Sequence, residues 1–189
     1  MKTTTSVKLI ALMMGMMILT TASFAQKAKT VMVGGAAMYP TKNIVENAVN
    51  SKDHTLLVAA VKAAGLVETL QGPGPFTVFA PTNSAFKKLP AGALESLLKP
   101  ENKAQLTTIL TYHVVAGKIS SKSLLKMIAD NGGTYKAKTV QGGMLSFSKK
   151  GNNIIVKDEK GGMSTVTIAD VNQSNGVIHV VNTVLMPKA

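Results

Sequence analysis

Three histidines are the residues whose chemistry would most readily support metal binding or proton transfer. His113 and His179 fall on stretches that favour β-strands, whereas His54 stands at the start of an expected helix. Two strand histidines could share a zinc ion if a carboxylate supplied a third ligand. No H-E-x-x-H pattern is present, and a partly buried histidine that hydrogen-bonds to the backbone is the simpler interpretation. We therefore expect no metal site, and we place His54 at the surface or in the capping region of its helix. The carboxylates considered as a third ligand are Asp158, Glu159 and Asp170.

The sequence lacks the motifs that catalysis would need. A serine hydrolase presents its nucleophile in a G-x-S-x-G turn, and a phosphate-binding loop has the pattern G-x-x-x-x-G-K-[ST]; neither occurs. The acidic residues fall mostly in loops or at helix ends, and the adjacent Asp158 and Glu159 would point apart on a strand. We predict a protein that is not an enzyme and holds no cofactor. A hydrolase that uses His113 or His179 remains the enzymatic alternative.

All 21 basic residues are lysines, against 9 acidic residues, and the 189-residue chain has a formal charge of +12. The lysines are spread along the chain, with no cluster denser than pairs such as Lys87-Lys88 and Lys149-Lys150. Nucleic-acid binding is not indicated, because arginine forks are absent and stacking aromatic rings are scarce. The charge instead favours solubility and contact with acidic polysaccharide. The absence of cysteine excludes disulfides, thiolate metal sites and a lipid-linked cysteine.

Residues 1–25 have the features of a secretory signal peptide. Lys2 and Lys8 provide positive charge, and the apolar segment Leu9–Leu19 is too short to span a bilayer. Small residues precede an expected cleavage point after Ala25. The chain is therefore expected to be exported, either to the periplasm or to the extracellular and cell-surface space. The alternative is a retained membrane anchor; after residue 25 no apolar run is long enough for a transmembrane helix.

The rest of the chain divides into a helical first half and a strand-rich second half. Residues 26–40 form an N-terminal arm with a short strand that ends at Gly34-Gly35. Hydrophobic periodicity predicts short helices, with Thr41, Asp53 and either Ser120 or Ser121 as caps. After Gly132, short β-rich runs alternate with Gly, Asn and Asp turns, which predicts one α+β domain. The expected helices are 41–49, 54–64, 101–111 and 120–128, with shorter helical stretches at 66–70, at 84–87 and between Pro90 and Pro100. The expected strands are 76–80, 112–115, 134–138, 144–148, 154–157, 165–168, 177–181 and 183–186.

Three segments together resemble the fasciclin domain, an adhesion-associated module of secreted and surface proteins. They are FTVFAPTNSAF over residues 76–86, LTYHVVAG over residues 110–117 and NGVIHVVNTVLMP over residues 175–187. They follow the family's order and distances, and Asn83 stands where the family more usually has Asp. The resemblance covers residues 41–187 and leaves the arm outside.

Local physics indicates that these segments are mainly determinants of the fold. The strand ends at Pro81, which cannot donate to a sheet, and Thr82 or Asn83 then caps the next helix. Asn175-Gly176 is a turn dipeptide that precedes a central strand. The positions assigned to the fold are Thr77, Phe79, Pro81, Thr82, Asn83, Phe86, Asn175, Gly176 and His179.

The resemblance implies a compact wedge in which short α-helices pack on a twisted antiparallel β-sheet, and it implies binding rather than catalysis. It also singles out Tyr112 and His113 as binding residues, because the family's Tyr-His region is associated with integrin contact in animal relatives.

We therefore expect an exported adhesion or matrix module that is not lipid-anchored. Its partners would be cell-surface or matrix proteins and acidic polysaccharide. The alternatives are a carrier of a small lipophilic ligand and a structural protein of the envelope. The sequence leaves the oligomeric state open.

Overall fold

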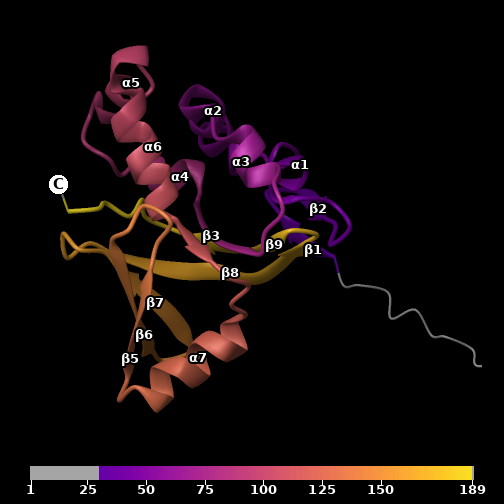
Figure 1. Cartoon of the computed structure of the whole chain (residues 1–189), viewed down its shortest axis with the longest axis vertical. Helices are drawn as coiled ribbons and strands as arrows, with labels where there is room; N and C mark the ends of the chain where they lie inside the picture. The colour runs from indigo at the N-terminus through magenta and orange to yellow at the C-terminus, as the bar shows by residue number, and fades with distance from the viewer. Residues whose placement is uncertain (1–29, 189) are drawn as a thin grey trace, which may run out of the picture.

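The computed structural model describes residues 30–188, so the expected leader and its cleavage point lie outside the described residues. Most of the helices are short, and all of them precede β5–β9 along the chain (Figure 1). The helices are α1 (Ile44–Ala48), α2 (Thr55–Ala64), α3 (Val67–Gln71), α4 (Asn83–Phe86), α5 (Ala93–Leu97), the 3-10 turn η1 (Pro100–Asn102), α6 (Lys103–Tyr112) and α7 (Ser121–Asp130).

Side-chain caps start three of these helices, and two expected caps are wrong. Asn43, not Thr41, begins α1, because Asn43 and Glu46 form a reciprocal capping box in which each side chain accepts the other's backbone N–H. Helix α2 begins at His54, not Asp53, and has no cap from its own N-cap side chain. The distant Asn83 supplies the missing oxygen, since its Oδ1 accepts the Leu56 N–H at 3.0 Å. Thr82 and Ser120 cap the other two, α4 and α7, as the sequence predicts.

The strands form a hairpin and a seven-stranded sheet in the order β4-β3-β9-β8-β7-β6-β5. All neighbours in the large sheet are antiparallel except β3 and β9, which run parallel. The α+β class is therefore confirmed, with one parallel pair inside the expected antiparallel sheet. The strands are β1 (Val31–Val33), β2 (Ala36–Met38), β3 (Phe76–Pro81), β4 (Val114–Ala116), β5 (Thr134–Lys138), β6 (Met144–Lys150), β7 (Asn153–Lys157), β8 (Met163–Gln173) and β9 (Gly176–Val181).

The start of one expected strand is wrong, and another expected strand is absent from the described residues. Tyr112 ends α6 and His113 caps the C-terminus of that helix, where the His113 N–H donates to the Leu110 carbonyl at 3.1 Å; β4 starts only at Val114. Residues 183–186 form no strand. Three backbone N–H groups of residues 185–188 donate to side chains instead of to a neighbouring strand.

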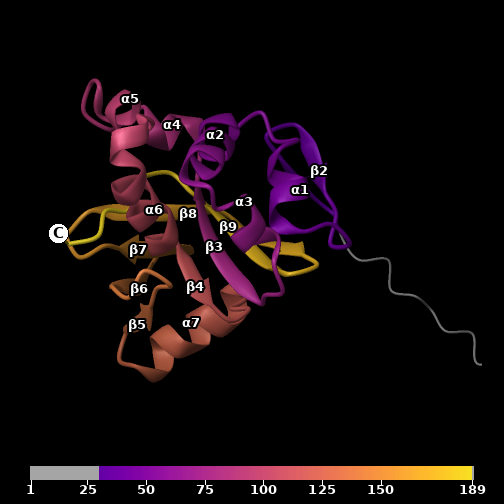
Figure 2. The same cartoon turned by 45° about the horizontal axis from the view of Figure 1, so that its top comes forward.

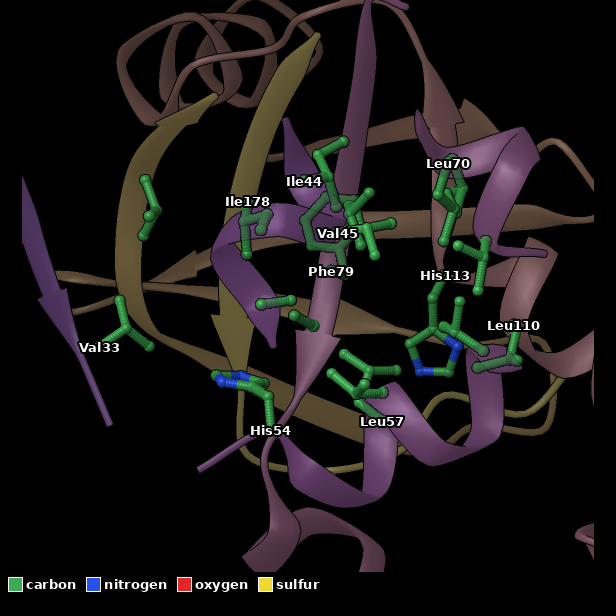
Figure 3. A pocket seen from close by; sticks show the side chains of 18 of the residues that line it. Val33, Ile44, Val45, His54, Leu57, Leu70, Phe79, Leu110, His113 and Ile178 are labelled. Carbon is green, nitrogen blue, oxygen red and sulfur yellow. The ribbon is translucent and has the colours of Figure 1, made fainter. Parts of the chain in front are cut away.

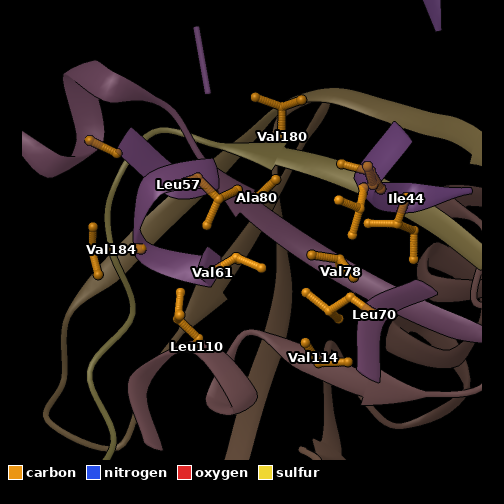
Figure 4. Close-up of a cluster of buried hydrophobic side chains, with 14 of the residues drawn as sticks. Ile44, Leu57, Val61, Leu70, Val78, Ala80, Leu110, Val114, Val180 and Val184 are labelled. Carbon is orange, nitrogen blue, oxygen red and sulfur yellow. The ribbon is translucent and has the colours of Figure 1, made fainter. Parts of the chain in front are cut away.

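The central strands β3 and β9 are covered on both sides, which explains their nearly continuous apolar sequences. Helices α1–α6 lie over one face, whereas α7 lies on the other side, against β5 and β6 (Figure 1). Val78 and Ala80 point into the helix-side core, and Phe79 and Val181 point into the α7-side core. Figure 4 shows part of the helix-side core, where Leu57 and Val61 of α2 meet Val78 and Ala80 of β3.

The described part of the N-terminal arm, residues 30–40, packs against the domain. Its β1–β2 hairpin lies beside α1, at the end of the molecule opposite the C-terminus (Figures 1 and 2). Val33 and Met38 are 4% and 3% exposed and belong to the helix-side core. The hairpin is therefore part of the folded unit. Within residues 30–188, no helix combines the length and the apolar character that crossing a bilayer requires.

Candidate functional site

His113 is enclosed and uses both ring nitrogens within the protein. Its Nδ1 donates to the carbonyl of Ile109 at 2.8 Å, and its Nε2 accepts the Leu185 N–H at 3.0 Å. The Leu185 N–H can only meet a lone pair, so the proton of the neutral ring lies on Nδ1. Burial lowers the pKa of His113 to about 4, while the Ile109 carbonyl and the Asp158 carboxylate oppose that shift.

Tyr112 is also enclosed, at 0% exposure. Its hydroxyl donates to the carbonyl of Met144 at 2.9 Å and accepts the Glu159 N–H at 3.1 Å. Burial is the main reason that the pKa of Tyr112 rises to about 12. The side chain therefore joins the end of α6 to β6 and to the turn that follows β7.

The acidic pair after β7, Asp158 and Glu159, forms hydrogen bonds with the C-terminal segment, residues 184–188. Asp158 accepts the Met186 N–H at 2.9 Å, and Glu159 accepts the Lys188 N–H at 3.2 Å. The expectation that both carboxylates would point apart on a strand is wrong, because they lie in a turn that binds backbone N–H groups. In this conformation neither Tyr112 nor His113 is accessible to a partner. Their role in binding stays a prediction.

His179 likewise bonds to the protein through both ring nitrogens. Its Nε2 donates to the Ile119 carbonyl at 2.8 Å, and its Nδ1 accepts the Asp170 N–H at 3.3 Å. The ring stacks on Phe79 with 5.6 Å between centroids. Asp170 in turn accepts from both the backbone and the hydroxyl of Ser121 at the start of α7. Burial lowers the pKa of His179.

Metal binding by His113 and His179 has no support in this arrangement, since neither ring has a free lone pair. Within residues 30–188, no group of three or more histidine or acidic side chains is placed to hold a metal ion.

The remaining motif positions join elements that are distant in sequence. Thr77 donates to the Gly117 carbonyl at 2.6 Å and accepts the Ile119 N–H. The Asn83 amide donates to the Lys52 carbonyl and to the Thr55 hydroxyl, which an aspartate could not do. Pro81 ends β3, and Phe86 is buried in the helix-side core.

Asn175 and Gly176 connect β9 to the helical layer and to β3. The Asn175 side chain accepts the Ile44 N–H and donates to the carbonyls of Leu70 and Gly72. Gly176 lies directly opposite Phe76 in the parallel pair. These contacts are consistent with a role in the fold, which the substitution of Gly176 in the Discussion tests.

A solvent-facing group of lysines occupies one face of β5–β7; we call it the lysine face. Inward positions of these strands, such as Ala137, Leu145 and Val156, fill the α7-side core. Because side chains alternate along a strand, the intervening residues point outward. The lysine face consists of Lys136, Lys138, Lys150 and Lys157, all exposed.

The strand register places two of these four lysines in one cross-strand row. Lys136 lies opposite Ser146, which lies opposite Lys157, so the two lysines are about 10 Å apart across three strands. No outward position of β5, β6 or β7 is acidic. The nearby Glu159 is occupied by the backbone N–H groups of Met144 and Lys188. Among residues 30–188 the one ion pair joins Lys126 to Asp130 on α7, away from this face.

The family model described as the fasciclin domain matches residues 52–187. The chain belongs to the fasciclin domain family. This confirms the resemblance carried by the three sequence segments. A solved structure of a domain pair from the insect cell adhesion molecule fasciclin I matches the fold with a TM-score of 0.69, at 17% identity, over 77% of this chain and 51% of that one.

Several curated proteins are similar in sequence to this fasciclin domain. Protein sll1483 of Synechocystis is 44% identical, covering 92% of this chain and 89% of the relative. Immunogenic protein MPB70 of Mycobacterium bovis is 37% identical over 74% of this chain and 66% of that protein. Transforming growth factor-beta-induced protein ig-h3 of the pig is 41% identical over 71% of this chain, which spans only 18% of that larger protein.

Acidification is expected to destabilise this fasciclin domain through His113. The unfolded ring takes up a proton near pH 6.5, whereas the folded ring does so only near pH 4. The unfolded state therefore binds more protons between these values, and the free energy of unfolding falls as the pH falls, by about 3 kcal/mol from this residue. Below about pH 4 both states are protonated and this loss ends. Urea unfolding from pH 7 to pH 4 measures the slope.

The matched variant for this measurement is His113→Gln, which keeps hydrogen-bonding capacity but does not titrate. Its slope between pH 6.5 and 4 is expected to be smaller than that of the wild type. The lowered pKa values of His54 and His179 account for part of the remaining slope. Equal slopes in the two proteins would contradict the assignment to His113.

Proposed function

We propose that this fasciclin domain is an exported adhesion-type binding module that holds acidic polysaccharide on its lysine face. Family membership supports the adhesion-type role, since the related insect protein is named a cell adhesion molecule. The observation that carries the polysaccharide partner is the group of four exposed lysines on the outward side of β5–β7, strands that contain no acidic residue. The sequence of residues 1–25 supports export.

The chemistry of the face suits an extended anionic chain. Lysine ammonium groups attract carboxylate or sulfate groups, and the hydroxyls of Ser146, Ser148 and Thr134 lie between them as hydrogen-bonding partners for sugars. The face belongs to strands that α7 contacts on their other side. Such contacts give modest affinity per site and depend on ionic strength, because exposed charges are screened by salt. A glycan with repeated anionic groups would make several such lysine contacts along its length.

Charge removal on the lysine face is expected to weaken glycan binding about tenfold. The triple variant Lys136→Gln, Lys138→Gln and Lys157→Gln loses three surface ion contacts, each worth about 0.5 kcal/mol, which together correspond to that change. Binding to immobilised alginate and dextran sulfate, with neutral dextran as the uncharged reference, measures it at low salt. Wild-type binding is expected to decline steeply as salt is raised.

The matched control removes the same charge elsewhere. Lys87→Gln, Lys99→Gln and Lys122→Gln change three exposed lysines on or beside the helices. This variant is expected to retain most of the affinity. An equal loss in both variants would show that net charge alone is responsible. Binding that does not change with salt, or no binding to either acidic glycan, would overturn the lysine face as the site.

The proposal assigns no catalysis to the domain. The two histidines that a hydrolase would need are both bonded within the fold, which supports a binding role.

A further inference from the structure

Two exposed methionines lie directly beside lysines of the lysine face. Met144 on β6 is 37% exposed, and Met163 at the start of β8 is 65% exposed. The register places Met144 opposite Lys138 and Met163 opposite Lys157. Residues directly opposite in an antiparallel pair point to the same side of the sheet, with their Cβ atoms about 5 Å apart. Each methionine is therefore the cross-strand neighbour of a lysine, and the face continues onto β8.

The other exposed large apolar side chains of residues 30–188 lie outside these strands. Met32 lies on the β1–β2 hairpin, Tyr39 follows β2, Val49 follows α1, and Val140 follows β5. Single exposed apolar side chains are ordinary on a protein surface. Two methionines on one side of a sheet, each opposite a lysine, instead give that surface a repeated combination of positive charge and apolar area.

The middle of the same surface is also partly apolar. Ile155 of β7 is half-buried and points outward, because its neighbours Ile154 and Val156 fill the α7-side core. It lies between Ser148 of β6 and Thr165 of β8 in the register. Ammonium groups, hydroxyls and small apolar areas therefore alternate across β5–β8. A glycan that offers only carboxylates and hydroxyls would leave the methionines without an apolar partner.

We propose that the lysine face binds an acidic polysaccharide that carries acyl esters, such as an O-acetylated uronate polymer, and that Met144 and Met163 contact the acyl methyl groups. This ligand class depends on the glycan site proposed above and defines its specificity. The lysines hold the carboxylates, and the flexible thioether side chains adapt to the methyl groups. Burial of one methyl-sized group strengthens binding about fourfold, and burial of two up to about fifteenfold.

An anionic membrane is the other partner that lysines and apolar side chains favour. Membrane-binding faces usually insert large side chains such as Trp, Phe or Leu. No outward position of β5, β6, β7 or the adjoining start of β8 carries one of these residues. The hydroxyls of Ser146 and Ser148 lie between the lysines, and they would lose hydrogen bonds in the apolar part of a bilayer. A glycan therefore fits this surface better.

The cavity in the helix-side core offers no other place for this ligand. It lies between the sheet and α1–α3, and Figure 3 shows Val33, Ile44, Leu57 and Ile178 among the residues of its lining. Its volume of about 60 Å³ is too small for a sugar ring. Its lining is mostly apolar, so the hydroxyls of a sugar would lose their hydrogen bonds there. The outer surface of the sheet is the better place for a polysaccharide.

Two probes of equal charge isolate the acyl contacts. The first is alginate without acyl groups, and the second is the same alginate after partial O-acetylation of its hydroxyls. The carboxylates and the chain length are unchanged, so the lysine contacts are the same for both. The wild-type protein is expected to bind the acetylated polymer about four- to fifteenfold more tightly at low salt. Calorimetric titration with fragments of matched length measures both affinities.

Variants connect this preference to the two methionines. The double variant Met144→Ser and Met163→Ser keeps every lysine, and it is expected to bind both alginates as the wild type binds the unacetylated one. The matched control is Met32→Ser, because Met32 is 61% exposed but lies on the β1–β2 hairpin. This control is expected to keep the wild-type preference. The triple lysine-face variant is expected to bind both polymers more weakly and to keep the ratio of the two affinities.

Several results would overturn the acyl contacts. Equal wild-type affinities for the two alginates would show that the acyl groups add nothing, while the glycan site itself would stand. A preference that survives the double methionine variant would place the acyl contact elsewhere. Binding of neither alginate would overturn the glycan site and the acyl contacts together. Tighter binding to phosphatidylglycerol vesicles than to acetylated alginate, lost in the double variant, would assign the methionines to a membrane instead.

Discussion

Replacing His113 with alanine is expected to lower the free energy of unfolding by about 3–5 kcal/mol. The ring is 2% exposed, so its removal leaves a cavity beside the central strands. The substitution also leaves the Leu185 N–H without its acceptor and removes a donor from the Ile109 carbonyl. The cost of the cavity and the cost of the unpaired backbone groups add, because the space is enclosed and these groups cannot reach water. Urea unfolding at pH 7.5, where His113 is neutral in both states, measures the loss without a contribution from titration.

A second core substitution distinguishes the hydrogen bond from the loss of packing. Leu124→Ala on α7 removes a side chain that is 1% exposed but touches none of the bonds to the C-terminal segment. Both variants are expected to be strongly destabilised. Only His113→Ala is expected to increase the local hydrogen exchange of the Leu185 amide beyond the effect of global unfolding. A loss below about 1 kcal/mol, or equal Leu185 protection in the two variants, would contradict the role of His113 in holding residues 184–188.

The sequence was sufficient for the class of the fold and for most strands, because apolar alternation marks each one locally. It did not reveal that β3 and β9 run parallel, since the pairing of segments about 100 residues apart depends on tertiary packing. The predicted boundary between α6 and the strand that follows it was wrong for a related reason. Tyr112 and His113 favour a strand by residue type, but their buried hydrogen bonds are available only at the end of the helix.

The candidate sites depended still more on the fold. The lysines looked dispersed along the chain, and only the register places Lys136 and Lys157 in one row on either side of Ser146. Asp158 and Glu159 were expected to point apart on a strand, because nothing local indicates that the C-terminal backbone donates to them. His54 stands in the capping region of its helix as expected, but the sequence did not reveal that its ring is buried, at 4% exposure.

The substitution Gly176→Ala is expected to destabilise the protein by about 3 kcal/mol. A Cβ at this position would lie 2.2 Å from the carbonyl oxygen of Phe76 and 3.0 Å from two further backbone atoms of that residue. The atoms in the way belong to the backbone of the β3–β9 pair, so rotation of a side chain cannot relieve the clash. The added methyl group must therefore push the two central strands apart. Thermal and urea unfolding, together with the protection of β3 and β9 amides, measure the effect.

Gly35→Ala separates this close approach from the general consequences of replacing a glycine. Gly35 has a φ of 77°, but a Cβ there would meet no atom within 4 Å, so only backbone strain of about 1 kcal/mol is expected. The prediction for Gly176 fails if the two variants lose equal stability, because steric contact with Phe76 would then contribute nothing. A larger loss of stability from Gly176→Ala than from Gly35→Ala would show that the Asn175-Gly176 segment is needed for the parallel β3–β9 pair. The β3–β9 pair contributes to both hydrophobic cores. Val78 and Ala80 lie in the helix-side core, whereas Phe79 and Val181 lie in the α7-side core. The glycine is thus expected to matter for the strand pairing and not for a turn alone.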